Sequence, residues 1–443
     1  MAARLRGRPA RGRGGGAGGG AGPAARGAGA GAPRGPGPGP GAVAGAGGPP
    51  LCHRLCVAPM MDWTDVWYRG LARLLTRRAR LYTEMVVDQT LVQQHRRGDT
   101  LERFLGTPAG QAPCALQLGG WDPEGVARAA ALAAPFGFDE INLNCGCPSP
   151  KVAGGGGFGA ALMADPGRVR RIVEGAQAAS GLPVTVKCRI GVDSRDSYAE
   201  LRDFVGEVSR AWEGGAGGAG PGQGGTFIVH ARKALMDGLS PAENRTVPPL
   251  RRGWAFALAR DFPHLRFVLN GEASGAAEAA RLLEAEAGGA RVAGVMIGRA
   301  AYQTPWHALA DVDRRLFPGE SNPCANRREL LLRYAEWCDG VLVEARAGSL
   351  PYGRPSVSRM AMPLNGLLYN EPGAALWRRA LHDHRKRCET MGELVAEVLG
   401  SCSSRQAEVL EAAPPRGWPA PAEASPGADL RLLDVPGEAP API

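Results

Sequence analysis

Residues 140–150 read EINLNCGCPSP, a short apolar alternation followed by two cysteines one residue apart and two prolines. The alternation predicts a strand from Glu140 to Asn144. The glycine and the prolines that follow predict a loop. The two cysteines fit a metal site, a redox pair or a single reactive thiol held at the end of a strand. Their spacing alone does not decide among the three.

The same pattern, a short apolar run that ends in polar or glycine-containing loop residues, occurs eight times after residue 51, with helical patterns between the runs. The eight runs are LCVAP (55–59), LYTEM (81–85), CALQL (114–118), EINLN (140–144), VTVKCR (184–189), TFIVHA (226–231), LRFVLNG (265–271) and VAGVMIGR (292–299). Parallel strands that are buried on both faces read as near-continuous apolar runs. The sequence therefore predicts an α/β fold, a (β/α)8 TIM barrel.

Composition divides the chain into four segments. We expect a disordered Ala/Gly/Arg/Pro-rich leader in residues 1–50, the barrel in 51–318, a helical domain in 319–411 and a disordered Pro/Ala-rich tail in 412–443. A glycine-rich stretch at 214–225 reads as a disordered surface insertion in the barrel.

The ten cysteines form neither repeated CxxC pairs nor a Cys/His set at zinc-finger spacing, which favours a reducing compartment and argues against structural zinc. No apolar run reaches the roughly 20 residues that a membrane span needs, so no membrane association is expected.

The net charge of +9 is concentrated at the start, because residues 1–50 hold seven arginines and no acidic residue, which leaves +2 for the rest of the chain. Whole-chain basicity is therefore weak evidence for nucleic-acid binding. An arginine-rich, acid-free start suits a transit peptide for a chloroplast or mitochondrion. The alternative is a plain disordered leader on a cytoplasmic protein.

In TIM barrels the functional groups lie at the carboxyl ends of the strands. Nearly every predicted strand ends in a hydrogen-bonding or charged group: Pro59-Met60 with Asp62, Glu84, Gln117, Asn144 with Cys147, Lys187 with Arg189, His230 with Arg232, Asn270, and Arg299. Lys187 interrupts an apolar run, and a buried lysine without an anionic partner is costly, which favours a ligand. Gln117 and Asn144 could instead satisfy backbone groups, and Glu84 could pair with Arg189.

The ends of the seventh and eighth strands read NGE and GRA, at the usual phosphate-binding corner of this fold. Glycine amides and Arg299 would hold a phosphate there. No acidic cluster with metal-ligand spacing accompanies them, so we expect a phosphate-bearing organic cofactor and no metal. GGGGFG at 154–159 matches a dinucleotide-binding pattern, but it does not open the first strand–helix unit, and we interpret it as a chance match.

The chain from Cys52 to about Trp306 resembles the tRNA-dihydrouridine synthases, and within them the A-type subfamily. The resemblance rests on APMMDWTD, LYTEM, LQLGG, INLNCGCPS, TVKCRIGVDSRDSY, HARKALMDGLSPAENRTVPPL, DFPHLRFVLNGE and GVMIGRAAYQTP. It implies an FMN-dependent barrel oxidoreductase that uses NADPH to reduce tRNA uridines 20 and 20a to dihydrouridine.

The resemblance also implies roles for individual residues. It places Pro59, Met60, Met61, Gln117, Lys187 and His230 at the flavin, Asn270, Gly271, Glu272, Gly298 and Arg299 at the phosphate end, and Asn144, Arg245 and Arg359 on tRNA. Glu272 stands where the family has its usual second glycine. RPSVSRM and EPGAALWRR carry the resemblance into the helical domain, where Pro363 breaks a helix that family members continue.

The resemblance identifies Cys147, in GCPS, as the catalytic cysteine and gives Cys145 no required role. Reduction of uracil at C6 leaves a carbanion at C5 that needs a proton, and an ordinary thiol is mostly protonated at neutral pH. A base inside folded tRNA must leave its stack to reach a barrel mouth. The basic stretch 377–387 would contact the phosphate backbone, or would be a solvated helix face.

Two alternative functions stay open at this point. One is a flavin-dependent barrel that reduces free pyrimidines, which would need no second binding domain. The other is a tRNA-binding chaperone without chemistry, which would need neither Cys147 nor Lys187.

Overall fold

The computed structural model describes residues 52–106, 110–149, 152, 157–213, 225–347, 355–414 and 434–437. The expected leader, nearly all of the 214–225 insertion and most of the expected tail lie outside these residues. Of the glycine-rich stretch 154–159, residues 154–156 also lie outside, whereas Gly157, Phe158 and Gly159 are described.

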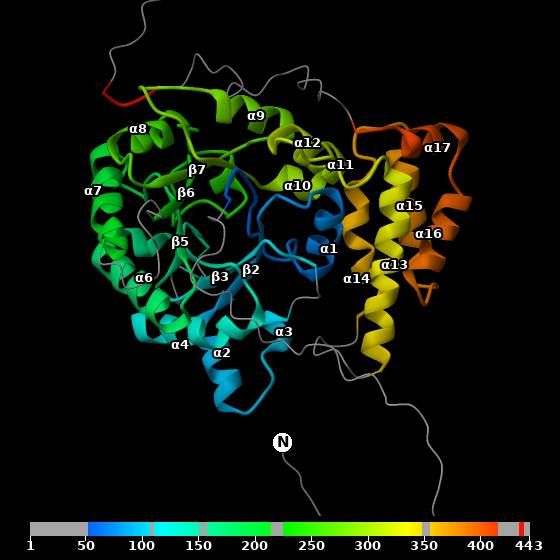
Figure 1. Cartoon of the computed structure of the whole chain (residues 1–443), viewed down its shortest axis with the longest axis horizontal. Coiled ribbons are helices and arrows are strands. Elements are labelled where there is room, and N and C mark those ends of the chain that lie inside the picture. The colour runs from blue at the N-terminus through cyan, green and yellow to red at the C-terminus, as the bar shows by residue number, and fades with distance from the viewer. Residues whose placement is uncertain are drawn as a thin grey trace, which may run out of the picture. The chain divides into compact units, whose positions relative to one another are not determined.

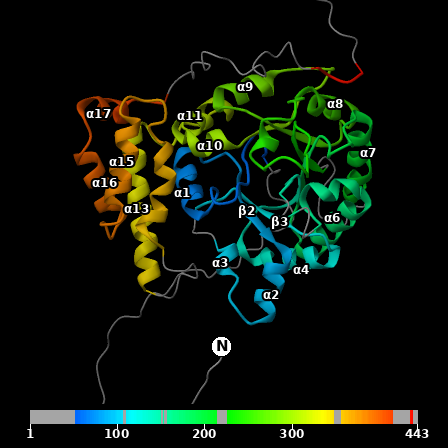
Figure 2. The ribbon, with the colours of Figure 1, turned by 180° about the vertical axis from the view of Figure 1, so that it is seen from behind.

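Eight parallel strands form a barrel with helices around it (Figures 1 and 2). The strands are β1 (Leu55–Val57), β2 (Leu81–Val87), β3 (Cys114–Gly119), β4 (Glu140–Cys145), β5 (Val184–Arg189), β6 (Thr226–His230), β7 (Arg266–Asn270) and β8 (Gly294–Ile297). All eight predicted strands and the predicted TIM barrel are confirmed.

The sheet closes between β1 and β2. Its order runs β1-β8-β7-β6-β5-β4-β3-β2, and β1 pairs in parallel with β8. Arg80, just before β2, completes the circle, since Val57 N donates to Arg80 O at 2.9 Å and Arg80 N donates to Leu55 O at 2.9 Å. Closure leaves the carboxyl ends of all the strands at one rim.

The helices around and beyond the barrel follow the chain order. They are α1 (Val66–Leu75), α2 (Asp88–Arg96), α3 (Glu102–Leu105), α4 (Pro123–Ala133), α6 (Pro166–Ser180), α7 (Tyr198–Ser209), α8 (Gly253–Asp261), α9 (Ala276–Glu284), α10 (Arg299–Gln303), α11 (Pro305–Leu309), α12 (Val312–Leu316), α13 (Arg327–Arg346), α14 (Val357–Met360), α15 (Ala374–His384), α16 (Met391–Gly400) and α17 (Ser404–Glu411). Short 3-10 turns are η1 (Ala134–Phe136), η2 (Gly159–Ala164), η3 (Arg210–Trp212), η4 (Glu243–Arg245) and η5 (Met362–Gly366).

The helix starts have local causes in the sequence. Asp165 accepts from Arg168 N to cap α6, with Pro166 in the first turn. Ser197 and Glu200 form a capping box at the start of α7. Each cap satisfies amide groups that the helix itself leaves without partners.

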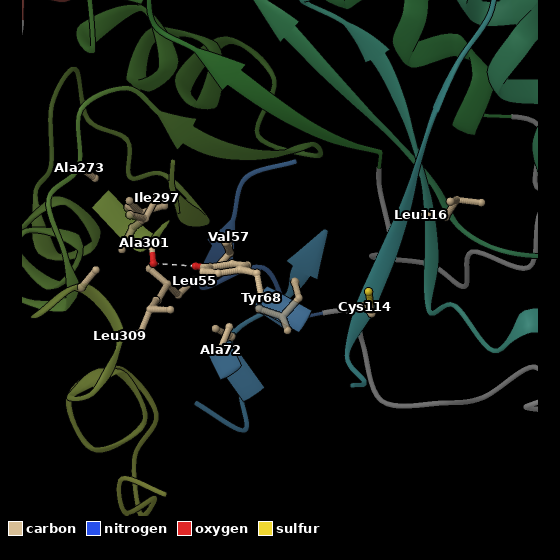
Figure 3. Packing of buried hydrophobic residues seen from close by; sticks show 14 of the residues in the cluster. Leu55, Val57, Tyr68, Ala72, Cys114, Leu116, Ala273, Ile297, Ala301 and Leu309 are labelled. Atoms are coloured by element: carbon tan, nitrogen blue, oxygen red, sulfur yellow. Dashed lines mark hydrogen bonds between the residues drawn. The ribbon is translucent and has the colours of Figure 1, made fainter. Parts of the chain in front are cut away.

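The main core lies between the outer faces of the strands and the helices. Figure 3 shows Tyr68 of α1 among Leu55, Val57 and Ile297, with its hydroxyl donating to Ala301 O at 2.8 Å. A second, smaller cluster fills part of the barrel interior with Cys56, Ala58, Tyr82, Ala115, Ile228, Val268 and Met296. The rest of the interior is polar, which sets it apart from an ordinary packed barrel core.

A buried carboxylate lies where β4 begins, at the end of the barrel opposite the rim. Glu140 accepts hydrogen bonds from Tyr82 Oη at 2.9 Å and Thr185 Oγ1 at 2.8 Å, and it pairs with His53 at 2.6 Å. Burial raises the pKa of Glu140, but His53 and Arg80 outweigh burial and lower it to about 2. Glu140 is therefore ionised at neutral pH.

Helices α13, α15, α16 and α17 lie together (Figure 1). Tyr334 of α13 donates to Trp67 O of α1 at 3.3 Å, and Trp337 meets the ring of Trp67 edge-on at 5.9 Å. The ring of Trp337 lies directly against Gly70 of α1, so any larger residue at position 70 would clash with it. The boundaries drawn from the sequence for this helical domain, 319–411, stay a prediction.

The helical pattern at 374–400 is divided into α15 and α16, because Thr390 accepts from Glu393 N and starts a new helix. Pro363 does interrupt helical structure, since it lies in the first turn of η5, directly after α14. In the expected tail, Val435 is 3% exposed and joins the main core. Among the helices that the structure describes, none combines the length and the apolar composition of a membrane span.

Candidate active site

The strand register brings several of the predicted site residues together at the rim. Asn144 of β4 lies beside Lys187 of β5. His230 of β6 lies beside Asn270 of β7, which lies beside Met296 of β8. Lys187 Nζ also donates to Asn270 Oδ1 at 3.1 Å across the barrel interior. The prediction that these strand ends form one polar site agrees with this geometry.

The loop that carries Cys147 is held by hydrogen bonds at both backbone groups of the cysteine. Asn144 Oδ1 accepts from Gly146 N and from Cys147 N, each at 3.0 Å. Cys147 O accepts from Ala160 N at 2.9 Å, and Arg189 Nε donates to Gly146 O at 3.1 Å. The thiol is partly exposed. It therefore sits on a fixed backbone and is still accessible to a substrate.

Gly159 also supports this loop, although it is not among the site residues predicted from the sequence. Its φ is +69°, and a Cβ there would lie 2.6 Å from Cys147 O. Both observations require glycine. The only signal in the sequence is the glycine run shortly after the cysteines, whose match to a nucleotide-binding pattern does not point to this role.

Cys145 ends β4, and strand alternation points its side chain to the face opposite that of Asn144, whereas Cys147 lies in the loop beyond the strand. Cys145 is 0% exposed and lies in the main core, and burial and then Cys188 raise its pKa well above the ordinary value. A redox pair is inconsistent with that placement. In the described residues no group of three or more His, Cys, Asp or Glu could hold a metal ion. The single reactive thiol is the alternative that the geometry supports.

Positive charge gathers around the Cys147 loop. Burial, and then Arg189, lowers the pKa of Lys187 to about 8. Arg245 is exposed by surface area, but partial burial of its charge, and then the neighbouring Arg299, lower its pKa. Cys147 is close enough to interact electrostatically with Lys187, Arg189 and Arg245. Such a group of cations stabilises an anion, either a bound ligand or a thiolate.

His230 is expected to be neutral. Burial, followed by the charges of Arg189 and Lys187, lowers its pKa well below the usual value. Within the described ranges, no hydrogen-bond partner is found for its ring. A neutral imidazole at the rim can donate one hydrogen bond and accept another from a ligand.

Glu84 and Arg189 do not pair, which corrects the structural interpretation that the sequence left open. Glu84 Oε1 accepts instead from Asp62 N at 2.6 Å. Arg189 Nη1 donates to Lys233 O at 3.1 Å and to Asn244 O at 2.8 Å, in addition to its bond to Gly146 O. Arg189 thus ties the loops after β4 and β6 together, a role the sequence did not predict.

Gln117 is 1% exposed and joins two other amides, since Nε2 donates to Asn142 Oδ1 at 2.8 Å and Oε1 accepts from Asn144 Nδ2 at 2.9 Å. Asn144 does satisfy backbone groups, those of the Cys147 loop. Contacts of Gln117 with flavin and of Asn144 with tRNA stay predictions.

The loop after β1 supplies Pro59, Met60 and Met61. Met60 N donates to Thr64 Oγ1 at 2.9 Å, which fixes the loop, and Met61 is 57% exposed. An apolar side chain exposed at the rim is suited to cover a flat aromatic ligand.

The predicted phosphate end combines glycine backbone with a cation. Asn270 Nδ2 donates to Met296 O at 3.0 Å, which links β7 to β8. A Cβ on Gly298 would meet only Ala58, at 3.9 Å, so space is open there. In the described part of the chain the side chain of Arg299 has neither a hydrogen bond nor an ion pair. The donor set fits a phosphate-bearing anionic cofactor.

Glu272, at the predicted phosphate end, has a left-handed backbone and a carboxylate paired with Arg232. Its φ is +55°, in the left-handed region that a glycine adopts more easily. Its carboxylate accepts from Arg232 Nη2 at 2.6 Å. Arg232 thereby compensates the negative charge that the glutamate brings.

Arg359 lies apart from this cluster. Its Nε is 3.2 Å from Asp65 Oδ2, the carboxylate that also caps α1, and its side chain is 62% exposed. Arg245, in η4, is exposed and has no side-chain hydrogen bond or ion pair within the described ranges. The tRNA contacts assigned to both arginines stay predictions.

Comparison with known proteins agrees with this geometry. The family model described as "Dihydrouridine synthase (Dus)" matches residues 56–402. A Vibrio vulnificus protein named tRNA-dihydrouridine(20/20a) synthase is 40% identical over 346 residues, which cover 78% of this chain and 96% of the relative. Proteins of the same name from Xanthomonas campestris and Pseudomonas putida are 42% identical (78% of this chain, 92% of the relative) and 46% identical (64% and 77%).

The chain belongs to the dihydrouridine synthase family. It is accordingly an oxidoreductase built on a TIM barrel, in a family of flavin-dependent enzymes. The family and fold predicted from the sequence are both confirmed.

Proposed function

We propose that the chain reduces the C5=C6 bond of uridines 20 and 20a in tRNA to 5,6-dihydrouridine, with FMN as its flavin and NADPH as the reductant. Relatives named for this activity match 78% of the chain. The observation that carries the proposal is the placement of Cys147, which is partly exposed on a fixed loop among Lys187, Arg189 and Arg245.

The rim offers the groups that an FMN would need. Lys187, the neutral His230 and Gln117 would contact its ring, with Pro59, Met60 and Met61 along the apolar side. Asn270, Gly271, Gly298 and Arg299 would hold the phosphate, while Glu272 stays paired with Arg232. When bound, the flavin supplies a hydride to C6 of uracil.

The chain's own chemical step is a proton transfer. The Cys147 Sγ–H bond breaks and its proton goes to C5 of the uracil, so that carbon gains the second hydrogen. The thiolate left behind faces Lys187, Arg189 and Arg245, whose charges stabilise it until solvent returns the proton.

Because Cys147 lies at the rim of the barrel, tRNA must bind over this rim. The target base must leave its stack to reach the rim. Arg245, Asn144 and Arg359 are the candidates for RNA contacts. On and after α15, the side chains of Arg378, Lys386 and Arg387 have no ion pair within the described ranges, so they are available to phosphates.

The direct test is reconstitution with purified protein, FMN, NADPH and an unmodified tRNA transcript, followed by mass mapping of the D loop. We expect the mass of two added hydrogens on uridines 20 and 20a. A transcript with cytidine at both positions is the control and should stay unchanged. Reduction of free uridine without reduction of tRNA would favour the free-pyrimidine alternative and overturn the proposal.

A further inference from the structure

A continuous series of side-chain hydrogen bonds runs through the barrel interior, from the buried carboxylate to the Cys147 loop. Thr185 Oγ1 donates to Glu140 Oε1 at 2.8 Å, and Asn142 Nδ2 donates to Thr185 Oγ1 at 2.8 Å. Gln117 Nε2 donates to Asn142 Oδ1 at 2.8 Å, and Asn144 Nδ2 donates to Gln117 Oε1 at 2.9 Å. We call these five residues the polar chain.

The strands place the members of the polar chain at facing positions. Gln117 of β3 lies beside Asn142 of β4, and Asn142 lies beside Thr185 of β5. The two-residue spacing of Glu140, Asn142 and Asn144 along β4 puts all three on the inner face of the barrel. Ordinary strand pairing is therefore sufficient to align the polar chain.

The groups at the two ends of the polar chain determine which member donates and which accepts in every hydrogen bond between them. An ionised carboxylate can only accept, so Thr185 must donate to Glu140 and accept from Asn142 Nδ2. At the other end Gly146 N and Cys147 N can only donate, so Asn144 must turn Oδ1 toward them and Nδ2 toward Gln117. Gln117 lies between these two ends, and a single orientation of its amide lets it donate to Asn142 and accept from Asn144.

Burial prevents water from replacing these bonds. Glu140 and Asn142 are 0% exposed, Gln117 is 1% exposed and Thr185 is 2% exposed. A buried amide that loses its partner is left without a hydrogen bond, or it flips and breaks the hydrogen bond to the next member of the polar chain. The orientation of each member thus depends on its neighbours.

We propose that Thr185 and Asn142 are positioning residues that act through Gln117 and Asn144 to hold the Cys147 loop. The consequence for the reduction of uridine rests on the proposed function, whereas the effect on the loop does not. Thr185 and Asn142 need touch neither cofactor nor substrate. The structural alternative is that the polar chain only fills the barrel interior.

The test measures alkylation of Cys147 in the purified full-length protein, with the modified peptide quantified by mass spectrometry. Thr185→Val removes the hydroxyl and keeps the shape. We expect Cys147 alkylation to rise roughly three- to tenfold, the equilibrium equivalent of one net hydrogen bond. Thr185→Ser, which keeps the hydroxyl, should react at the parental rate. Cys402, partly exposed beyond α16, is the internal control and should be unchanged.

A double substitution separates positioning from packing. In an Asn144→Ala background the loop is already released from the polar chain, so adding Thr185→Val should not raise Cys147 alkylation further. Additive effects, an equal rise in Thr185→Ser, or a parallel rise at Cys402 would overturn the proposal. If Thr185→Val does not fold, Thr185→Ala replaces it.

A parallel measurement of flavin reoxidation by tRNA keeps the two proposals distinct. Thr185→Val should slow this step more than it slows flavin reduction by NADPH, and Thr185→Ser should restore it. If the parental protein does not reduce tRNA at all, the proposed function fails. The alkylation rates then still decide whether the polar chain positions Cys147.

Discussion

Lys187 shows how a single residue connects the barrel interior to the proposed cofactor. The sequence singled it out because a lysine interrupts an apolar strand, and the structure places it at the rim with Asn270 as its hydrogen-bond partner. Burial, with Arg189 nearby, lowers its pKa to about 8. In the flavin-free protein Lys187 is thus charged at neutral pH and loses its proton only slightly above it.

This pKa predicts a pH dependence for FMN binding. An anionic ligand favours the charged lysine and raises its pKa in the complex. Affinity should therefore be greatest below pH 8 and should fall as the pH rises through 8, where flavin-free Lys187 loses its proton. Lys187→Met should bind FMN roughly ten- to a hundredfold more weakly at neutral pH, the usual cost of one charged hydrogen bond.

Fluorescence titration of FMN on both sides of pH 8 checks this. In Lys187→Met, FMN affinity should change little across pH 8. In Lys386→Met, which removes an exposed charge after α15, the affinity should still fall as the pH rises. An unchanged pH profile in Lys187→Met would show that another group is responsible.

At the scale of elements, the loop after β4 and the turn η2 form a single unit. Cys147 O accepts from Ala160 N at the start of η2, and Gly159 lies against the cysteine backbone. Two segments that are separate in the sequence therefore determine where the thiol lies.

Gly159→Ala should disturb this unit more than backbone strain alone predicts. A left-handed backbone costs a non-glycine residue about 1–2 kcal/mol. The new Cβ would also lie 2.6 Å from Cys147 O. We expect lower stability and a roughly hundredfold slower reoxidation of flavin by tRNA, the effect of a displacement of about 1 Å.

Gly181→Ala is the matched control, because Gly181 has a φ of +68° with nothing within 4 Å of the added Cβ. Thermal melts and reoxidation rates of both variants separate strain from displacement. Equal reoxidation rates in the two variants would mean that Gly159 does not support the thiol.

The elements also show which features the sequence could predict. Apolar runs predicted all eight strands, and the strand ends identified Lys187, Asn144 and Cys147 as rim residues. Thr185 and Asn142 were not predicted, because a threonine in a strand reads as ordinary strand propensity and only pairing with neighbouring strands reveals its partners. Gly159 was missed because its contact joins two loops.

The whole molecule includes the leader, residues 1–50, which lies outside the described residues. We propose that it is a transit peptide for a chloroplast or mitochondrion. Its seven arginines could otherwise tether tRNA, since they account for most of the net charge of +9.

A protein that starts at Pro50 tests the two roles. If the leader is an address, this protein should modify tRNA in vitro at the full-length rate and with the same salt dependence. A large loss of tRNA affinity together with a flatter dependence on salt would show instead that the arginines contact phosphates. Fusion of residues 1–50 to a fluorescent protein reports localisation directly.

Flavin reoxidation by tRNA decides whether Cys147 is the proton donor of a tRNA-dihydrouridine synthase. Cys147→Ala should still bind FMN and accept electrons from NADPH, while its reoxidation by tRNA slows roughly 10²- to 10⁴-fold, the usual contribution of a positioned general acid. Cys145→Ala, which changes a buried core residue on the outer face of β4, should stay within a few-fold of the parental rate. Near-parental reoxidation in Cys147→Ala, or equal defects in the two variants, would contradict the account.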